Sequence, residues 1–193
     1  GHALVADREV PYVQLVDHLI GRGGGSGGLA AAQRAAEYGA TVALIEPAPL
    51  GGTCVNVGCV PKKITFNAAS LAHALDDARD YGFDITVRGH DWAGVVARRT
   101  AYVQRLNGIY ERNLAKKGIT HIAARARFTG PHTVEAGGRV LSGRHIVVAT
   151  GGRPAVPQIP GHELGYVSDD FFGLTARPQR VAIVGAGYIA VEF

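Results

Sequence analysis

A run of eight residues, GRGGGSGG at 21–28, limits what this chain can fold into more than any other feature. It lies between an apolar stretch at 12–20 and an alanine-rich stretch at 29–39 that ends in Gly39. The first stretch favours a short β-strand, and the second favours a helix that a glycine terminates. Residues 41–46 (TVALIE) favour a second strand. Strand, glycine turn, helix and strand form a βαβ unit, which predicts an α/β fold with a parallel sheet.

The spacing inside the glycine run predicts a ligand. Gly23, Gly25 and Gly28 follow the pattern Gly-x-Gly-x-x-Gly, which lets a backbone approach a pyrophosphate closely. Glu46 ends the second predicted strand, 18 residues after Gly28, about where a carboxylate meets a ribose 2′-hydroxyl. A plain glycine linker would explain neither the spacing nor the acid. The pattern therefore predicts a dinucleotide-binding site.

The composition of the chain limits the classes of partner that it could bind. The chain has 193 residues, 47% of them hydrophobic, and a formal net charge of +4, which suits an anionic ligand but is weak evidence for nucleic acid. No apolar run reaches the roughly 18 residues that span a bilayer, and no signal peptide is recognisable. We expect no nucleic-acid partner, no membrane partner and a cytoplasmic location. The eight histidines are scattered without the spacing of metal ligands, so no metal site is expected.

Both cysteines, Cys54 and Cys59, lie in one stretch, LGGTCVNVGCVPKK at 50–63. Two cysteines are too few for a disulfide-stapled scaffold and favour redox or metal chemistry. Residues 60–75 favour a helix whose first turn tolerates Pro61, and a helical turn can bring residues five apart near disulfide range. We interpret the pair as a two-electron relay beside the dinucleotide site; the alternative is a pair of buried structural thiols.

A second glycine pattern occurs near the end of the chain. Residues 180–193 (RVAIVGAGYIAVEF) favour a buried strand followed by Gly185-x-Gly187-x-x-Ala190, in which alanine is an accepted variant. We expect this to be the start of a second dinucleotide-binding domain. Between the two patterns, residues 87–118 favour a helix and 119–149 favour short β-segments. The basic residues of that helix are either a solvated face or an anion-facing surface.

The stretch from 51 to 63 (GGTCVNVGCVPKK) resembles the redox-disulfide motif of the FAD-dependent pyridine-nucleotide disulfide oxidoreductases. Within that family, residues 91–92, 101–110, 168–172 and 184–192 are most similar to the glutathione reductase branch. The resemblance implies a Rossmann-like FAD-binding domain with a central parallel sheet, a small antiparallel β-segment, and the truncated start of a Rossmann-like NAD(P)-binding domain. The expected divisions are a poorly matching segment 1–22, the FAD-binding domain 23–175, and the second domain from 176 to 193.

The resemblance also implies roles for single residues. Those expected to hold the flavin dinucleotide are Gly23, Gly25, Ser26, Gly28, Glu46, Thr53, Thr150 and Gly151. Cys54 would attack the substrate disulfide, and Cys59 would lie against the flavin. Lys62 would approach the flavin and pair with Glu192. The residues expected near the nicotinamide cofactor are Gly185, Gly187 and Tyr188, and those expected to touch glutathione disulfide are Ser26 and Tyr110.

The implied reaction passes a hydride from NADPH to FAD, then electrons to the Cys59–Cys54 disulfide and on to glutathione disulfide. The family form is a homodimer whose acid/base histidine this sequence does not contain. We therefore expect the 193 residues to be the N-terminal portion of such an enzyme and to be inactive alone. The alternatives are an inert or FAD-binding remnant, or another disulfide reductase such as mercuric reductase. Three positions depart from the family pattern: Asp17, Arg22 and Gln33.

Overall fold

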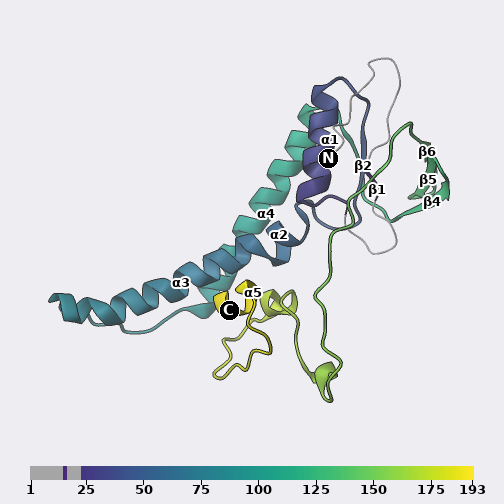
Figure 1. Ribbon diagram of the computed structural model, residues 1–193. Helices are drawn as coiled ribbons and strands as arrows, with labels where there is room; N and C mark the ends of the chain where they lie inside the picture. The colour runs from purple at the N-terminus through teal and green to yellow at the C-terminus, as the bar shows by residue number, and fades with distance from the viewer. Residues whose placement is uncertain (1–14, 17–22) are drawn as a thin grey trace. The chain divides into compact units, whose positions relative to one another are not determined.

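The computed structural model describes residues 15–16 and 23–193 (Figure 1). They form two compact units. The first combines the described part of residues 1–56 with 105–153, and the second combines 57–104 with 154–193. Asp17, Arg22 and most of the strand expected at 12–20 lie outside the described residues.

The first unit is built on a four-stranded parallel sheet, as the βαβ pattern predicts. Its strands are β1 (Leu15–Val16), β2 (Ala43–Ile45), β3 (Thr120–Ile122) and β7 (Val147–Val148), in the order β3-β2-β1-β7. Leu15 lies opposite Leu44 on one side and Val147 on the other. Helix α1 (Ser26–Glu37) connects β1 to β2. The predicted turn, helix and second strand are therefore confirmed.

Alternating side chains of β2 enter two separate hydrophobic clusters. Leu44, which is fully buried, packs with Leu29 of α1 and with Leu114. Its neighbours Ala43 and Ile45 join the other cluster. Because successive side chains of a strand point to opposite faces, the sheet is covered on both sides and β2 is apolar throughout.

The second cluster is completed by a small antiparallel sheet, which the family resemblance implied and whose strands lie where the sequence predicted short β-segments. It consists of β4 (Ala126–Gly130), β5 (Thr133–Ala136) and β6 (Arg139–Ser142), in the order β4-β5-β6. Val134 of β5 is fully buried and lies opposite Phe128 and Leu141. Val134 thus anchors this sheet in the cluster that contains Ile45.

Helices dominate the second unit. The elements are α3 (Cys59–Asp77), η1 (Ala78–Tyr81), η2 (His162–Leu164), η3 (Asp170–Gly173), α5 (Tyr188–Glu192) and the first half of α4 (Trp92–Lys116). Arg99 of α4 is buried and donates a hydrogen bond of 2.8 Å to the carbonyl of Phe172. Burial lowers the pKa of Arg99 from its ordinary value. This buried arginine therefore ties α4 to η3.

The strand expected at the start of the second glycine pattern does not form. Residues 180–187 have no strand structure, and Val181, Ile183 and Val184 are exposed. A strand is stable only when a neighbour satisfies its backbone groups, and no strand among the described residues pairs with this segment. The prediction of a buried strand here was wrong, although the short helix α5 follows it as expected.

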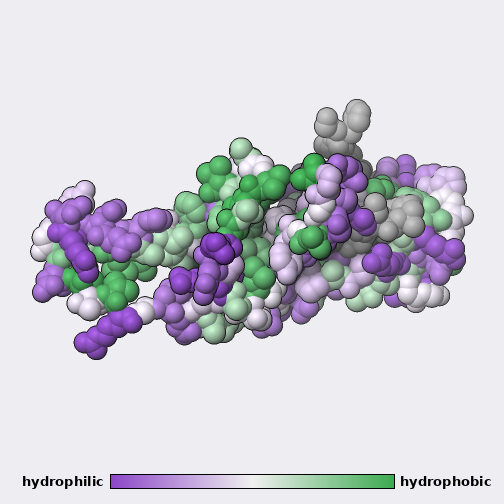
Figure 2. Space-filling model, turned by 90° about the horizontal axis from the view of Figure 1, so that it is seen from below, coloured by the Kyte–Doolittle hydropathy of each residue, from purple (hydrophilic) through white to green (hydrophobic). Residues whose placement is uncertain are grey.

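Hydrophilic and hydrophobic side chains are interspersed over the face drawn in Figure 2. Among residues 15–16 and 23–193, no helix has both the length and the apolar character that crossing a membrane would require.

Candidate functional site

A pocket of about 320 Å³ lies in the first unit where three glycine-containing segments meet. The first segment leads into α1, the second begins helix α2 (Gly52–Val57), and the third follows β7. Parallel α/β sheets bind ligands beyond the carboxyl ends of their strands, at the point where strand order reverses, and β1 with its neighbours β2 and β7 is such a point. The lining residues are Gly25, Ser26, Gly27, Gly52, Thr53, Cys54, Ala149, Gly151 and Gly152.

The glycines at this site allow the backbone segments to touch. A Cβ built on Gly28 would lie 1.7 Å from the carbonyl oxygen of Gly23, so any side chain there would force the turn apart. Gly52 has a φ of +60°, and its Cβ would lie 2.6 Å from the Cα of Gly25. The Gly51 N–H also donates a 2.8 Å hydrogen bond to the Gly24 carbonyl. The spacing recognised in the sequence is therefore a packing requirement.

The first turn of α1 lies at this pocket and offers backbone N–H groups as hydrogen-bond donors, without an acidic side chain in that turn. Gly25 caps the helix, and its carbonyl accepts from the Leu29 N–H at 2.9 Å. No acidic residue lies in the first turn, and Gly25, Ser26 and Gly27 all line the pocket. The unpaired N–H groups at the start of a helix attract anions. The residues present therefore fit a pyrophosphate.

Glu46 is completely buried at the end of β2 and ties that strand to the glycine turn. Its Oε2 accepts a hydrogen bond from the Gly24 N–H at 2.7 Å, and its Oε1 accepts one from Ala48 at 2.9 Å. The structure thus places the predicted ribose acid beside the turn. The contact with a ribose remains a prediction.

The two cysteines lie in different helices. Cys54 is half-buried in α2 and lines the pocket, whereas Cys59 is exposed and is the first residue of α3. Cys54 belongs to the first unit and Cys59 to the second, and their pairing as a disulfide remains a prediction.

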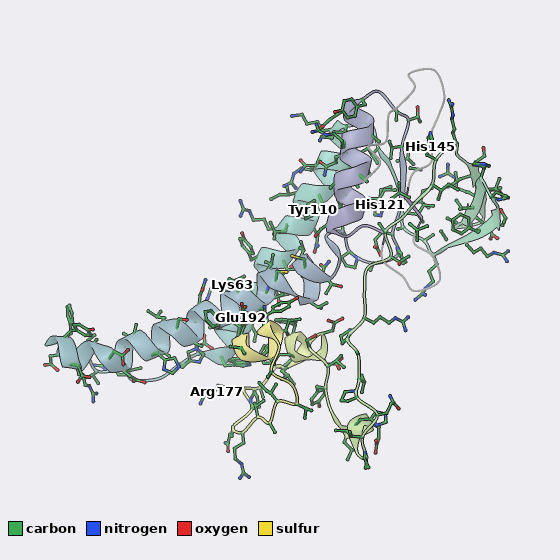
Figure 3. The ribbon with its side chains drawn as sticks, in the orientation of Figure 1. Lys63, Tyr110, His121, His145, Arg177 and Glu192 are labelled. Carbon is green, nitrogen blue, oxygen red and sulfur yellow. The ribbon has the colours of Figure 1, made fainter. Side chains whose placement is uncertain are left out.

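Within the second unit, α3 and α5 meet through charged side chains. The Nζ of Lys62 lies 2.8 Å from Oε2 of Glu192 as an ion pair, and only 9% of the Lys62 side chain is exposed. Lys63 Nζ lies 3.3 Å from Oε1 of the same carboxylate, and Figure 3 labels both residues. Lys62 also lies over the ring of Tyr188, 5.2 Å from its centroid.

These ammonium groups lower the pKa of Glu192. The contact with Lys62 is the largest cause, burial opposes it, and Lys63 adds to it. The Glu192 carboxylate is therefore held in its ionised form by two lysines. Three of the predicted site residues lie together here: Lys62, Tyr188 and Glu192.

Several predicted site residues are not among the residues that line the pocket. Tyr110 of α4 is half-buried and packs against the cluster that contains Leu29. Thr150 is absent from the lining, although Gly151 beside it is present. Gly185 and Gly187 lie in the exposed segment that precedes α5. The pocket thus brings two of the predicted pyrophosphate residues, Gly25 and Ser26, together with Cys54, whereas Gly23 and Gly28 are not part of its lining, and all of these roles remain predictions.

Two asparagines that sequence reasoning missed contact the start of α2. Asn56 lies inside the cysteine stretch, and its amide bonds to carbonyls at the beginning of that helix. Asn107 reaches the same place from α4. Asn56 lies between the two cysteines and Asn107 lies in the run 101–110 that carries the resemblance, but neither position by itself predicts these hydrogen bonds.

Comparison with known proteins gives a family. The sequence profile of the family described as pyridine nucleotide-disulphide oxidoreductase matches residues 22–193. A glutathione reductase of Yarrowia lipolytica is 50% identical over 190 residues, which cover 91% of this chain and 40% of that protein. A glutathione reductase of Schizosaccharomyces pombe is 51% identical over 191 residues, covering 94% of this chain and 41% of that protein. The chain thus spans about 40% of the length of these curated relatives.

Solved structures agree with this family. The HOCl-induced flavoprotein disulfide reductase RclA from Escherichia coli is similar with a TM-score of 0.75 and 29% identity. The similarity covers 95% of this chain and 38% of RclA. A Cu(II) complex of RclA gives a TM-score of 0.71 and 30% identity, covering 87% of this chain and 36% of that one.

Proposed function

Because this chain belongs to the pyridine nucleotide-disulphide oxidoreductase family, we propose that it supplies the FAD site and the redox-active cysteines of an NADPH-dependent glutathione-disulfide reductase. The observation that carries this proposal is that Cys54 lines the same pocket as Gly25 and Ser26. A nucleophilic thiol and an anion-binding helix start are thus within one cavity. The two glutathione reductases that are about 50% identical support the choice of substrate.

Residues of the first unit would hold the cofactor. The start of α1 would bind the pyrophosphate through backbone N–H groups, since its glycines leave no side chain in the way. Thr53 and Gly151 would line the rest of the cofactor, and Glu46 would fix the turn from beneath. When bound, FAD supplies the means of taking a hydride from the nicotinamide and passing two electrons to a disulfide.

The thiols would carry out the exchange with substrate. The Cys54 thiolate attacks one sulfur of glutathione disulfide, which breaks the substrate S–S bond and releases one glutathione thiolate. Cys59, as a thiolate, then attacks the Cys54 sulfur of the mixed disulfide and releases the second glutathione. Each departing thiolate takes up one proton. The two glutathiones leave reduced, and Cys54 and Cys59 are left joined as a disulfide for the next cycle.

In the second unit, Lys62 would provide a fixed positive charge. Its ammonium group is nearly buried and is held by Glu192, so it keeps a defined position without an added ligand. A fixed cation stabilises negative charge that develops nearby during reduction. Assembly as a homodimer and a cytoplasmic location remain predictions.

The test separates the two half-reactions. In the FAD-loaded full-length enzyme that contains this chain, Cys54→Ser should abolish reduction of glutathione disulfide, because the attacking thiol is gone. Flavin reduction by NADPH should remain within about twofold of the unmodified enzyme, since Cys54 takes no part in it. Stopped-flow absorbance follows the flavin, and release of glutathione follows the other half-reaction. Equal loss of both half-reactions, with FAD content unchanged, would refute the assignment of Cys54.

A further inference from the structure

Two asparagine amides join α2 to α4 within the first unit. The Nδ2 of Asn107 donates to the Leu50 carbonyl at 2.6 Å and to Oδ1 of Asn56 at 2.9 Å. The Nδ2 of Asn56 faces the carbonyls of Pro49, Leu50 and Gly52 at 3.1, 3.3 and 2.9 Å. Both hydrogens of the Asn107 amide are therefore used. We call Asn56 and Asn107 the amide clamp.

Helix α2 needs such restraint because it is short. It has six residues, and an isolated helix of that length is unstable in water. On one side, Gly52 contacts the backbone of Gly25, and Val55 is buried. On the other side, the amide clamp closes the loop from 49 to 56 and fixes it to α4. Cys54 lies between these two anchors.

We propose that Asn107 is a positioning residue for Cys54. Its amide holds the start of α2 in place, so that Cys54 stays half-buried at the pocket wall. This proposal rests on the proposed function in one respect, namely that Cys54 is the nucleophile. Without the amide, the Leu50 carbonyl and Asn56 Oδ1 lose a shared donor, and α2 opens more often.

Thiol accessibility tests this proposal directly. In the 193-residue chain carrying Cys59→Ser, Cys54 is the single cysteine, and its alkylation by iodoacetamide can be timed by mass spectrometry. Asn107→Asp keeps the shape of the side chain and removes the donors, whereas Asn107→Leu removes them without adding charge. Both should speed alkylation about 5- to 20-fold, as expected for the loss of one to two hydrogen bonds. The matched control is Asn113→Asp, an exposed asparagine of the same helix, which should leave the rate within twofold.

Each outcome decides the proposal. An alkylation rate that is unchanged or slower in both Asn107 variants would overturn it. Loss of the native circular dichroism spectrum in both variants, while Asn113→Asp keeps it, would also overturn it, because a positioning role predicts a local change.

A second measurement uses the FAD-loaded full-length enzyme that contains this chain. Asn107→Asp should slow the reduction of glutathione disulfide about tenfold while flavin reduction by NADPH stays within twofold. A displaced Cys54 thus reacts faster with a small alkylating agent and slower with glutathione disulfide. A purely structural defect would not change these two rates in opposite directions. An enzyme that never reduces glutathione disulfide refutes the proposed function, whereas the alkylation rates still decide the role of Asn107.

Discussion

The two glycine turns of this chain share a sequence pattern and differ in everything around it. In both, the glycine before the helix has extended backbone, with φ and ψ of −81° and −171° at Gly25 and −73° and 168° at Gly187. The first turn, however, packs so closely that a Cβ on Gly28 would meet Gly23. A Cβ on Gly187 would meet nothing within 4 Å. The local geometry follows the sequence, whereas close packing depends on a neighbouring sheet.

The two helices that follow these turns are also held differently. Helix α1 has twelve residues and buries Leu29 and Ala32 against the parallel sheet. Helix α5 has five residues, none of them buried, and contacts α3 through the ion pair between Lys62 and Glu192. We therefore expect the first turn to respond to changes of volume and the second to changes of charge.

The largest effect is expected from Gly28→Ala. The added methyl group would lie 1.7 Å from the Gly23 carbonyl oxygen, so the turn must move or α1 must shift. Overpacking of this kind costs about 3 kcal/mol, and FAD binding should be lost with it. Urea unfolding followed by circular dichroism measures the free energy of unfolding, and flavin absorbance measures the bound FAD.

The control is Gly187→Ala, a glycine-to-alanine change in the second turn, where Ala190 already occupies the position that corresponds to Gly28. It should lower the free energy of unfolding by no more than about 1 kcal/mol, the loss expected when alanine replaces glycine at a helix N-cap, because the site has open space. Similar losses for the two variants would show that the turns are not held differently.

Lowering the pH should have a smaller effect, a loss of stability of α5 at the second turn. The folded-state pKa of Glu192 lies below its ordinary value of 4.5, mainly because of Lys62. Its ionised form therefore stabilises α5 above pH about 4.5, and that stabilisation is lost as the pH falls through the lowered pKa. The protection of the Val191 N–H against amide exchange, measured relative to the intrinsic rate at each pH, should fall over that range, since this N–H bonds to the Gly187 carbonyl.

Glu192→Gln should remove this pH dependence, since no carboxylate remains to titrate. The matched variant Glu111→Gln, at an exposed glutamate on α4, should keep it. The same pH dependence in both variants and the unmodified chain would mean that Glu192 does not anchor α5.

The first glycine turn was predicted from the sequence more successfully than the second. The first turn, α1, β2 and the small antiparallel sheet were predictable because each has a local signal in spacing or alternation. The strand expected at 180–185 was wrong because a strand requires a partner, which periodicity does not reveal. Placement of Cys54 at the pocket followed from the cysteine stretch. The roles of Asn107 and buried Arg99 could not be predicted, because each contacts residues more than 50 positions away.

Flavin binding tests the central claim most directly. The claim is that the start of α1, with Gly25 at the pocket wall, holds the pyrophosphate of FAD. Gly25→Val places a branched side chain there, and Gly187→Val makes the same change at the exposed turn. Bound FAD, measured by absorbance after gel filtration of the flavin-supplemented protein, should be absent from Gly25→Val and unchanged in Gly187→Val. Full flavin content in Gly25→Val would contradict the account.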